Sequence, residues 1–137
     1  MSKPNFTGVW KLIRGECNFG YLPPPHLRVD TIAHEDTKLS ISTRQKDDNG
    51  DITVDRNLVI GEEPIKISIQ GKPRKVRAFW DESTLVVETK SEISGKERRL
   101  EDRWSMDEDN EWVTIDRFHD LPGGPVRQSL RMQRRDA

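Results

Sequence analysis

Phe6-Thr7-Gly8-Val9-Trp10-Lys11-Leu12 is the stretch that decides the fold of this chain of 137 residues. Side chains alternate between the two faces of a strand, so Phe6, Gly8 and Trp10 share one face. Gly8 leaves space beside the strand, and the large ring of Trp10 fills it. The pattern predicts a strand with one buried face, in which Phe6, Gly8 and Trp10 have structural roles.

The alternation of apolar and polar side chains continues after this stretch, and no window shows apolar residues at helical spacing. The breaks between the alternating segments are rich in glycine, proline, asparagine and aspartate, which favour turns. The strongest hairpin signal is Asn49-Gly50, because both residues accept positive φ. We therefore expect about ten strands, at residues 8–14, 27–33, 38–45, 52–60, 65–70, 75–80, 84–93, 97–106, 112–119 and 126–133.

Short connections between successive strands favour an antiparallel up-and-down meander, because a Greek key needs at least one long crossover. Closing such a meander removes both exposed edges, which favours a closed barrel over the alternative, a sandwich. Only 32% of the residues are hydrophobic, and a barrel tolerates polar side chains and water inside. The expected fold is all-β, a closed antiparallel barrel of about eight to ten strands, in a single domain at residues 1–137.

The balance of charges limits the kinds of partner. With 23 basic and 24 acidic side chains the formal net charge is −1, which gives no overall attraction to nucleic acid or to an anionic membrane. Cys17 is the single cysteine, so an intramolecular disulfide and a multi-cysteine metal site are excluded. No stretch approaches the ~20 apolar residues of a membrane span, and the first residues lack the apolar run of a signal peptide. We expect a cytoplasmic monomer or homodimer; an exported chain with its leader removed would look the same.

The stretch from Phe6 to Phe19 resembles the first strand of the intracellular fatty-acid-binding proteins, in the calycin superfamily. Further along, Trp104 followed by Thr114-Ile115-Asp116-Arg117 resembles the Thr-Ile-x-Arg strand of that family, and Arg131 is placed like its second arginine. The resemblance implies a ligand-binding barrel in which the two arginines contact the ligand carboxylate. Gln133 stands where the family has a tyrosine, which weakens the implied link to fatty acids.

A second departure concerns the lid. The family inserts two short helices between its first two strands, whereas here residues 15–25 form that connection and include Pro23-Pro24-Pro25. No helical lid is therefore expected. The chain is more similar overall to a group of small, mostly uncharacterised bacterial lipocalin-like domains, through Leu85 to Lys90 and Asp102-Arg103-Trp104.

Polar residues interrupt the apolar faces of several predicted strands. Charged residues are seldom buried, which favours surface positions for Arg56 and Asp102; the alternative is a polar anchor in an apolar cavity, where an unpaired charge would attract a ligand. Trp80 shares a face with Val76 and Ala78, which favours a core position, and Arg131 has the opposite parity to its apolar neighbours. The candidate ligand contacts are Arg56, Trp80, Val87, Thr89, Asp102, Trp104, Ile115, Arg117, His119 and Arg131.

The expected function is noncovalent binding of a small apolar or amphipathic molecule inside the barrel, with no cofactor, metal or catalytic residue. One alternative is a barrel enzyme or haem-binding protein that uses His119 and Arg117, although an isolated histidine near a strand end is usually solvated and an enzyme is the less favoured class. The other is a barrel that binds single-stranded nucleic acid or a protein through the basic and aromatic residues 66–80. Nucleic acid is not the expected partner, because the acidic turn at 107–111 shows that local runs of either sign occur here.

Overall fold

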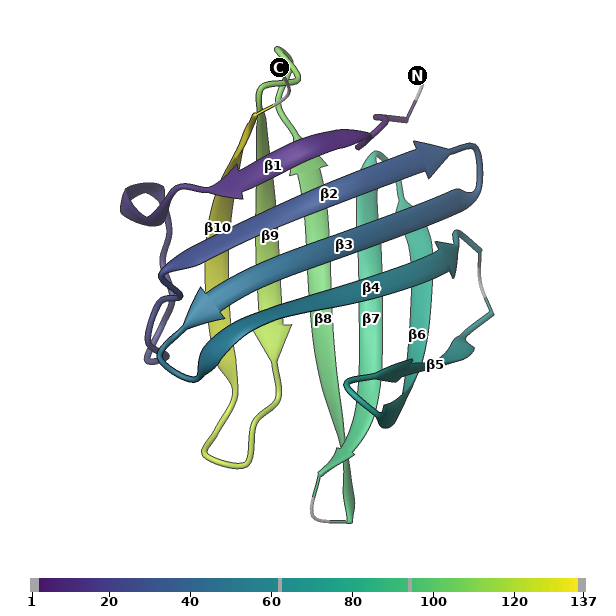
Figure 1. The fold of residues 1–137 in the computed structure, drawn as a ribbon. Coiled ribbons are helices and arrows are strands. Elements are labelled where there is room, and N and C mark those ends of the chain that lie inside the picture. Colours follow the sequence, from purple (N-terminus) through teal and green to yellow (C-terminus); the bar gives the residue numbers. More distant parts are fainter. Residues whose placement is uncertain (1–2, 62, 94, 136–137) are drawn as a thin grey trace.

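The computed structural model describes residues 3–61, 63–93 and 95–135, and these form ten antiparallel strands (Figure 1). The strands are β1 (Gly8–Leu12), β2 (Leu27–Glu35), β3 (Lys38–Asp47), β4 (Gly50–Val59), β5 (Ile65–Ile69), β6 (Lys72–Asp81), β7 (Thr84–Ile93), β8 (Lys96–Met106), β9 (Trp112–His119) and β10 (Val126–Arg134). A single 3-10 turn, η1 (Arg14–Glu16), follows β1, and the described residues contain no α-helix. None of them forms a helix long and apolar enough to cross a membrane.

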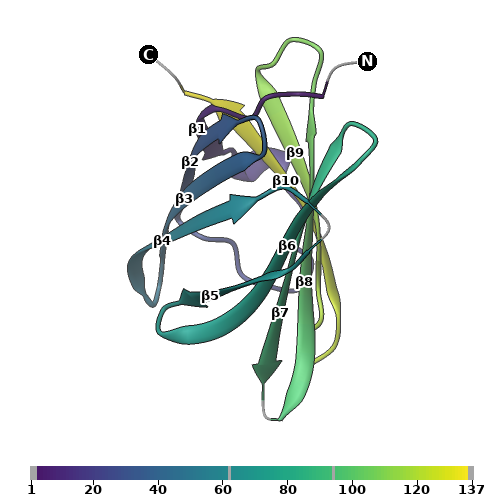
Figure 2. The ribbon, with the colours of Figure 1, turned by 90° about the vertical axis from the view of Figure 1, so that its right-hand side faces the viewer.

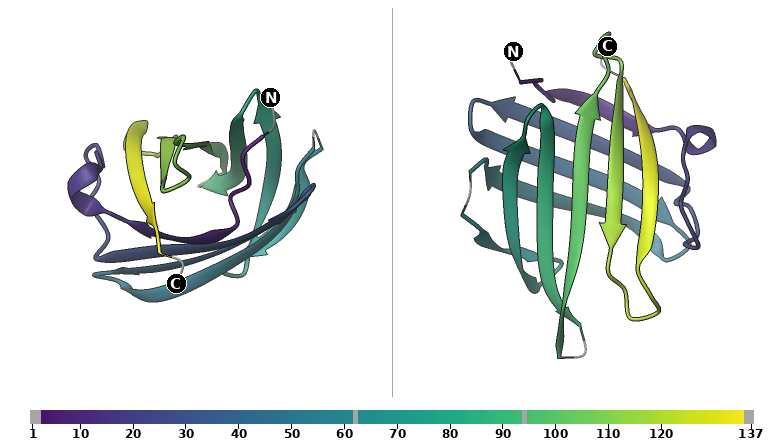
Figure 3. Two further views of the ribbon diagram at one scale, coloured as in Figure 1. Left: turned by 90° about the horizontal axis from the view of Figure 1, so that it is seen from above. Right: turned by 180° about the vertical axis from the view of Figure 1, so that it is seen from behind.

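The strands follow one another in an up-and-down sheet with the order β4-β3-β2-β1-β10-β9-β8-β7-β6-β5. β1 pairs with β2 on one side and with β10 on the other, and so joins the two halves of the sheet. The two halves face each other as curved layers when seen from the side (Figure 2), and their strands cross when seen from behind (Figure 3). The edge strands β4 and β5 share no ladder among the described residues, but just after β4 a bridge joins Ile60 to Ala78 of β6, and the Gly61 N–H donates to the Ala78 carbonyl at 2.7 Å. The barrel is therefore nearly closed, and the predicted fold class is confirmed.

The strand boundaries differ from the predicted ones mainly at β6. Its first residues were expected to be part of a break because Pro73 lacks a backbone N–H, yet β6 begins at Lys72 and Pro73 pairs with Ser68. The hairpin turn lies instead at Gln70 and Gly71, whose φ angles of 53° and 76° match a tight two-residue turn. The β3–β4 hairpin also forms, with Asp48 and Asn49 as its loop, and only Gly50 there has a positive φ.

The end of the barrel that carries the chain termini is filled by aromatic side chains, and we call it the closed half. Trp10 and Phe6 are fully buried, and the indole N–H of Trp10 donates to the Phe6 carbonyl at 2.8 Å. The Phe6 ring lies 6.0 Å from the ring of Trp104 and 6.2 Å from that of Trp80. The indole of Trp10 is thus buried, and its N–H has a hydrogen-bond partner. This is the position expected for a side chain that fills one end of the barrel.

Residues 13–26 cross the opposite end of the barrel as a strap, in the place where the helical lid was judged not to fit. Asn18 forms a two-way backbone bridge with Ser129 at 2.8 and 2.9 Å, and the Gln128 amide donates to the Phe19 carbonyl at 2.9 Å. Gly20 has a φ of +64°, and a Cβ there would lie 2.6 Å from Val126 Cγ2. The strap can therefore follow β10 closely only because this position is a glycine.

Candidate functional site

The interior away from the termini is lined by polar side chains, and we call it the open half. It contains a cavity of about 370 Å³, and each strand from β2 to β9 contributes at least one residue to its lining. The charged and polar side chains that line it are Arg28, Thr43, Gln45, Arg56, Arg74, Thr89, Ser91, Asp102, Arg117 and His119, and Val54, Ile69, Leu100 and Leu121 complete the wall. A partly open space with this lining holds polar or charged groups more readily than a hydrocarbon chain.

Asp102 and Arg117 form a bidentate ion pair in the wall of the cavity. They are direct neighbours on β8 and β9, and the Arg117 Nε and Nη2 donate to the two Asp102 oxygens at 2.7 and 3.0 Å. Asp102 is only 2% exposed. Burial alone would raise the pKa of its carboxyl, but the charge and hydrogen bonds of Arg117, with smaller effects of Arg28 and Arg56, lower that pKa below its usual range. Asp102 is therefore ionised, and Arg117 is the counter-ion of its carboxylate.

Arg28 and Asp30 form a second pair, on the inner face of β2. The Arg28 Nε and Nη2 donate to the two Asp30 oxygens at 3.2 and 3.0 Å, and both residues are buried, at 4% and 0% exposure. Burial alone would lower the pKa of the Arg28 guanidinium, yet the charge and hydrogen bonds of Asp30 raise it. The two residues neutralise each other because alternation places i and i+2 on the same face of the strand.

Arg56 is the third guanidinium in the open half, and it makes no hydrogen bond or ion pair with any of the described residues. Both buried carboxylates are engaged elsewhere, Asp30 by Arg28 and Asp102 by Arg117. Burial lowers the pKa of Arg56, and the distant carboxylates oppose this only in part because Arg28 and Arg117 act in the same direction as burial. Arg28 and Arg117 each have a carboxylate partner, whereas Arg56 has no counter-ion among the described residues.

His119 lies beside this group at the end of β9; it lines the cavity and is half-buried, so the expected solvated ring is only partly in contact with solvent. It also lines a smaller hollow of about 130 Å³ under the strap, where Phe19, Leu22 and Pro25 form the outer wall. Burial lowers the pKa of His119, and the charge of Arg117 lowers it further. The ring is therefore neutral at pH 7 and gains a positive charge only in acid.

The structure brings together about half of the residues predicted as ligand contacts. Arg56, Thr89, Asp102, Arg117 and His119 all line the cavity, so Arg56 and Asp102 are interior residues rather than the surface residues that their charge favoured. The others belong to the closed half or to the outside: Trp80, Val87, Trp104, Ile115 and Arg131.

The inward position considered for Arg131 is wrong. Its guanidinium carbon lies 4.7 Å from the centre of the Trp112 ring, on the face of β10 opposite to the buried Leu130 and Met132. The parity of the strand decides this, because an inward Arg131 would turn both apolar neighbours to the solvent. Trp80 lies in the closed half, where its ring stacks on Phe6 and its centre lies 6.0 Å from that of the His34 ring.

Two important members of the site, Arg28 and Asp30, are absent from the sequence prediction. On β2 the more polar positions point inward and the apolar Leu27 and Val29 are only partly buried. The signal available in the sequence is the spacing Arg-x-Asp before Ile32, because an arginine and an aspartate two residues apart can neutralise each other on one face.

The arrangement bears on both alternatives. In the basic hairpin, Trp80 is turned into the barrel and the Arg77 guanidinium carbon lies 4.2 Å from the centre of the Phe79 ring. Arg77 therefore covers one face of Phe79, and one face of Trp80 is covered by Phe6, which reduces the ring surface on which bases could stack. Among the described residues, no group of three or more His, Cys, Asp and Glu side chains is placed to hold a metal ion.

Comparison with known proteins identifies the architecture. No protein-family profile matches the sequence, and no curated protein does. Several solved structures do match its fold. A secretory abundant heat soluble protein from Ramazzottius varieornatus is 12% identical with a TM-score of 0.72, and the match covers 98% of each chain. Zebrafish ileal bile-acid-binding protein, solved with cholic acid, is 10% identical with a TM-score of 0.67 over 95% of this chain and 98% of its own. Human cRBP IV is 14% identical with a TM-score of 0.64 over 96% and 99%. At these identities the likeness concerns the fold alone.

Proposed function

We propose that this barrel binds a small amphipathic molecule noncovalently in its open half, and that an acidic group of the ligand pairs with Arg56. The observation that carries the proposal is the charge of Arg56 in the cavity wall, which has no partner because the buried carboxylates Asp30 and Asp102 are paired with Arg28 and Arg117. An unpaired charge at a largely enclosed site is costly, and a ligand anion removes that cost.

A second polar group in the same cavity supports the proposal. The hydroxyl oxygen of Thr43 is buried and has no hydrogen-bond partner among the described residues. Buried hydroxyls are nearly always satisfied, so an unsatisfied one beside an unpaired arginine indicates a site completed by another molecule. The structural relative solved with cholic acid, an amphipathic acid, fits this ligand class.

The size and lining of the cavity set the kind of ligand. The apolar half of the interior is filled by its own side chains, and the remaining space of about 370 Å³ is rich in arginine. A long hydrocarbon chain has no free apolar tunnel to occupy. The ligand is therefore compact, with one face suited to Val54, Ile69 and Leu100 and an acidic group suited to the arginines.

Native mass spectrometry of the freshly purified protein tests this proposal. We expect a population that carries a noncovalently bound small acid, and we expect Arg56→Gln to lose it while Arg131→Gln, a change of equal charge on the outer face, keeps it. A wild-type protein that carries no ligand and binds no small acid saturably would overturn the proposal. So would equal occupancy in the two variants.

A further inference from the structure

The outer face of the sheet carries a row of four cations beside this cavity. Lys66, Lys75, Lys90 and Arg99 come from four neighbouring strands, β5 to β8, and each is directly opposite the next in the strand register. Neighbouring strands are about 4.8 Å apart, so the row places positive charges at close intervals. Like charges directly opposite each other destabilise a sheet. The row therefore does not serve the stability of the barrel.

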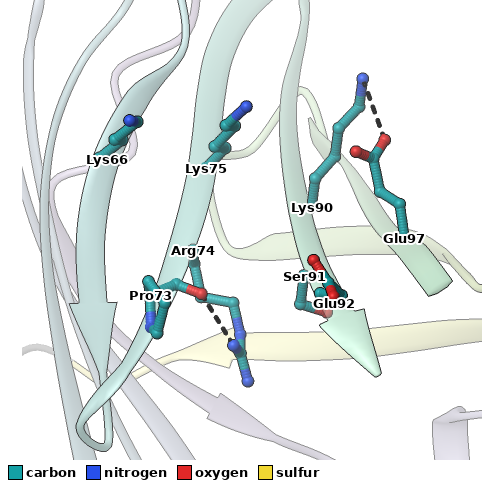
Figure 4. A pocket seen from close by; sticks show the side chains of 8 residues that line it. All are labelled: Lys66, Pro73, Arg74, Lys75, Lys90, Ser91, Glu92 and Glu97. Carbon is teal, nitrogen blue, oxygen red and sulfur yellow. Dashed lines mark hydrogen bonds and ion pairs between the residues drawn. The ribbon is translucent and has the colours of Figure 1, made fainter. Parts of the chain in front are cut away.

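Acidic side chains balance only one end of this cationic row. Glu97 lies 3.9 Å from Lys90, and Glu88 lies 3.8 Å from Arg99. Lys66 and Lys75 have no ion pair with any described residue. Figure 4 shows the side chains of Lys66, Lys75 and Lys90 next to one another over their strands, with the Lys90–Glu97 contact at one side.

The row borders an outer hollow of about 300 Å³, and this hollow shares two residues with the interior cavity. Arg74 and Ser91 line both spaces. The paired register of β6 and β7 ends at Lys75–Lys90, so Arg74 and Ser91, one residue further along, are no longer paired across the two strands. Beyond that point β6 pairs only with β5 and β7 only with β8, and the tips of the two hairpins lie apart (Figure 1).

We propose that the place where β6 and β7 separate is the side entrance of the barrel, and that the cationic row attracts an anionic ligand and delivers it past Arg74 to Arg56. This inference rests on the proposed function, because it assumes that the ligand is an acid that binds inside. Positive side chains then follow the whole path of the ligand. Lys66 and Lys75 lie on the outer face, Arg74 lies at the entrance, and Arg56 lies in the interior cavity. Surface charges of this kind increase the rate of association much more than they change the rate of dissociation.

Stopped-flow fluorescence can test the entrance with two probes, the anionic anilinonaphthalene sulfonate and the uncharged Nile red. The test variant replaces Lys66, Lys75 and Lys90 by Gln, and the control replaces Lys11, Lys38 and Arg135, which are exposed elsewhere, by Gln. Both variants remove three positive charges. At low salt we expect the test variant to bind the sulfonate about tenfold more slowly than the control, with little change in the dissociation rate. Added salt should remove most of this difference because it screens exposed charges.

Three results would overturn the inference. Equal association rates of the sulfonate in the two variants would remove the cationic row as the approach path while leaving the proposed function standing. An equal slowing of Nile red would show that the substitutions act on the shape of the opening and not through charge. Absence of saturable sulfonate binding by the wild type would overturn the proposed function together with the inference.

Discussion

The two halves of the barrel interior use opposite means of filling space. The closed half packs Phe6, Trp10 and Trp104 against aliphatic side chains, and the buried indole N–H of Trp10 donates to the Phe6 carbonyl. In the open half, four arginines, Asp102 and His119 line a cavity, and Asp30 pairs with one of these arginines, Arg28. Stability comes from the first half. The second half carries charges that do not balance, which is the arrangement expected where a fold gives up stability for binding.

The largest effect should come from Trp10→Ala in the closed half. It removes a fully buried ring and its hydrogen bond to the Phe6 carbonyl, so we expect a loss of about 3 to 5 kcal/mol in the free energy of unfolding. Chemical denaturation followed by tryptophan fluorescence measures it. A variant as stable as the wild type would contradict the assignment of this half as the source of stability.

In the open half, Asp102→Asn should cost about 3 kcal/mol, because it leaves the Arg117 guanidinium partly buried without its carboxylate. The double variant Asp102→Leu with Arg117→Met removes both charges and should recover most of that loss. Urea denaturation of the three proteins checks this. If the double variant is no more stable than Asp102→Asn, the cost does not arise from an unpaired charge.

Arg56→Met should have a smaller effect of the opposite sign. Removal of the charge that lacks a counter-ion should raise the free energy of unfolding of the ligand-free protein by about 1 kcal/mol. Ligand-free protein, prepared by unfolding and refolding, is required for this measurement because a bound acid would stabilise the wild type. Destabilisation of similar size would show that Arg56 has a stabilising partner.

The smallest effect is the pH dependence of stability. The folded-state pKa of Asp102 is lowered, so its contribution is complete above the ordinary carboxyl pKa of about 4 and is lost as the pH falls through the folded value. The pKa of His119 is lowered too, so the unfolded chain takes up that proton first and stability begins to fall below about pH 6.5. As the pH is lowered from 7.5 to 3, the urea midpoint should decrease first below about pH 6.5, because of His119, and again below about pH 4, because of Asp102. The variant His119→Gln should show a smaller decrease in the first range. A rise in stability from pH 7 to pH 5 would contradict this.

The fold could be predicted from the sequence because its signals are local. Alternation, turn residues and short connections define strands and their order, and β7 and β9 have the predicted bounds. Pro73 misled the prediction of β6, because a proline without a backbone N–H marks a break in most strands but is tolerated at the end of a hairpin.

The site was only half predictable, because charge by itself argues for the surface. Arg56 and Asp102 were identified as exceptions by the apolar residues on their strand face, whereas Arg28 and Asp30 were not, since apolar neighbours on the other face of β2 appeared better suited to the interior. Their burial depends on the pairing between them and on the register with β1 and β3, which no single segment encodes. The row of opposed cations likewise exists only once four strands are aligned.

The most direct test of the account is an equilibrium titration of Arg56→Gln and Arg131→Gln with anilinonaphthalene sulfonate. The two variants lose the same charge, one inside the open half and one on the outer face of β10. A hydrogen-bonded ion pair in a largely enclosed site is worth about 1.5 to 3 kcal/mol, so Arg56→Gln should weaken binding by about ten- to a hundredfold. Arg131→Gln should stay within about twofold of the wild type. Equal affinities of the two variants would contradict the claim that the unpaired Arg56 is the anchor of the site.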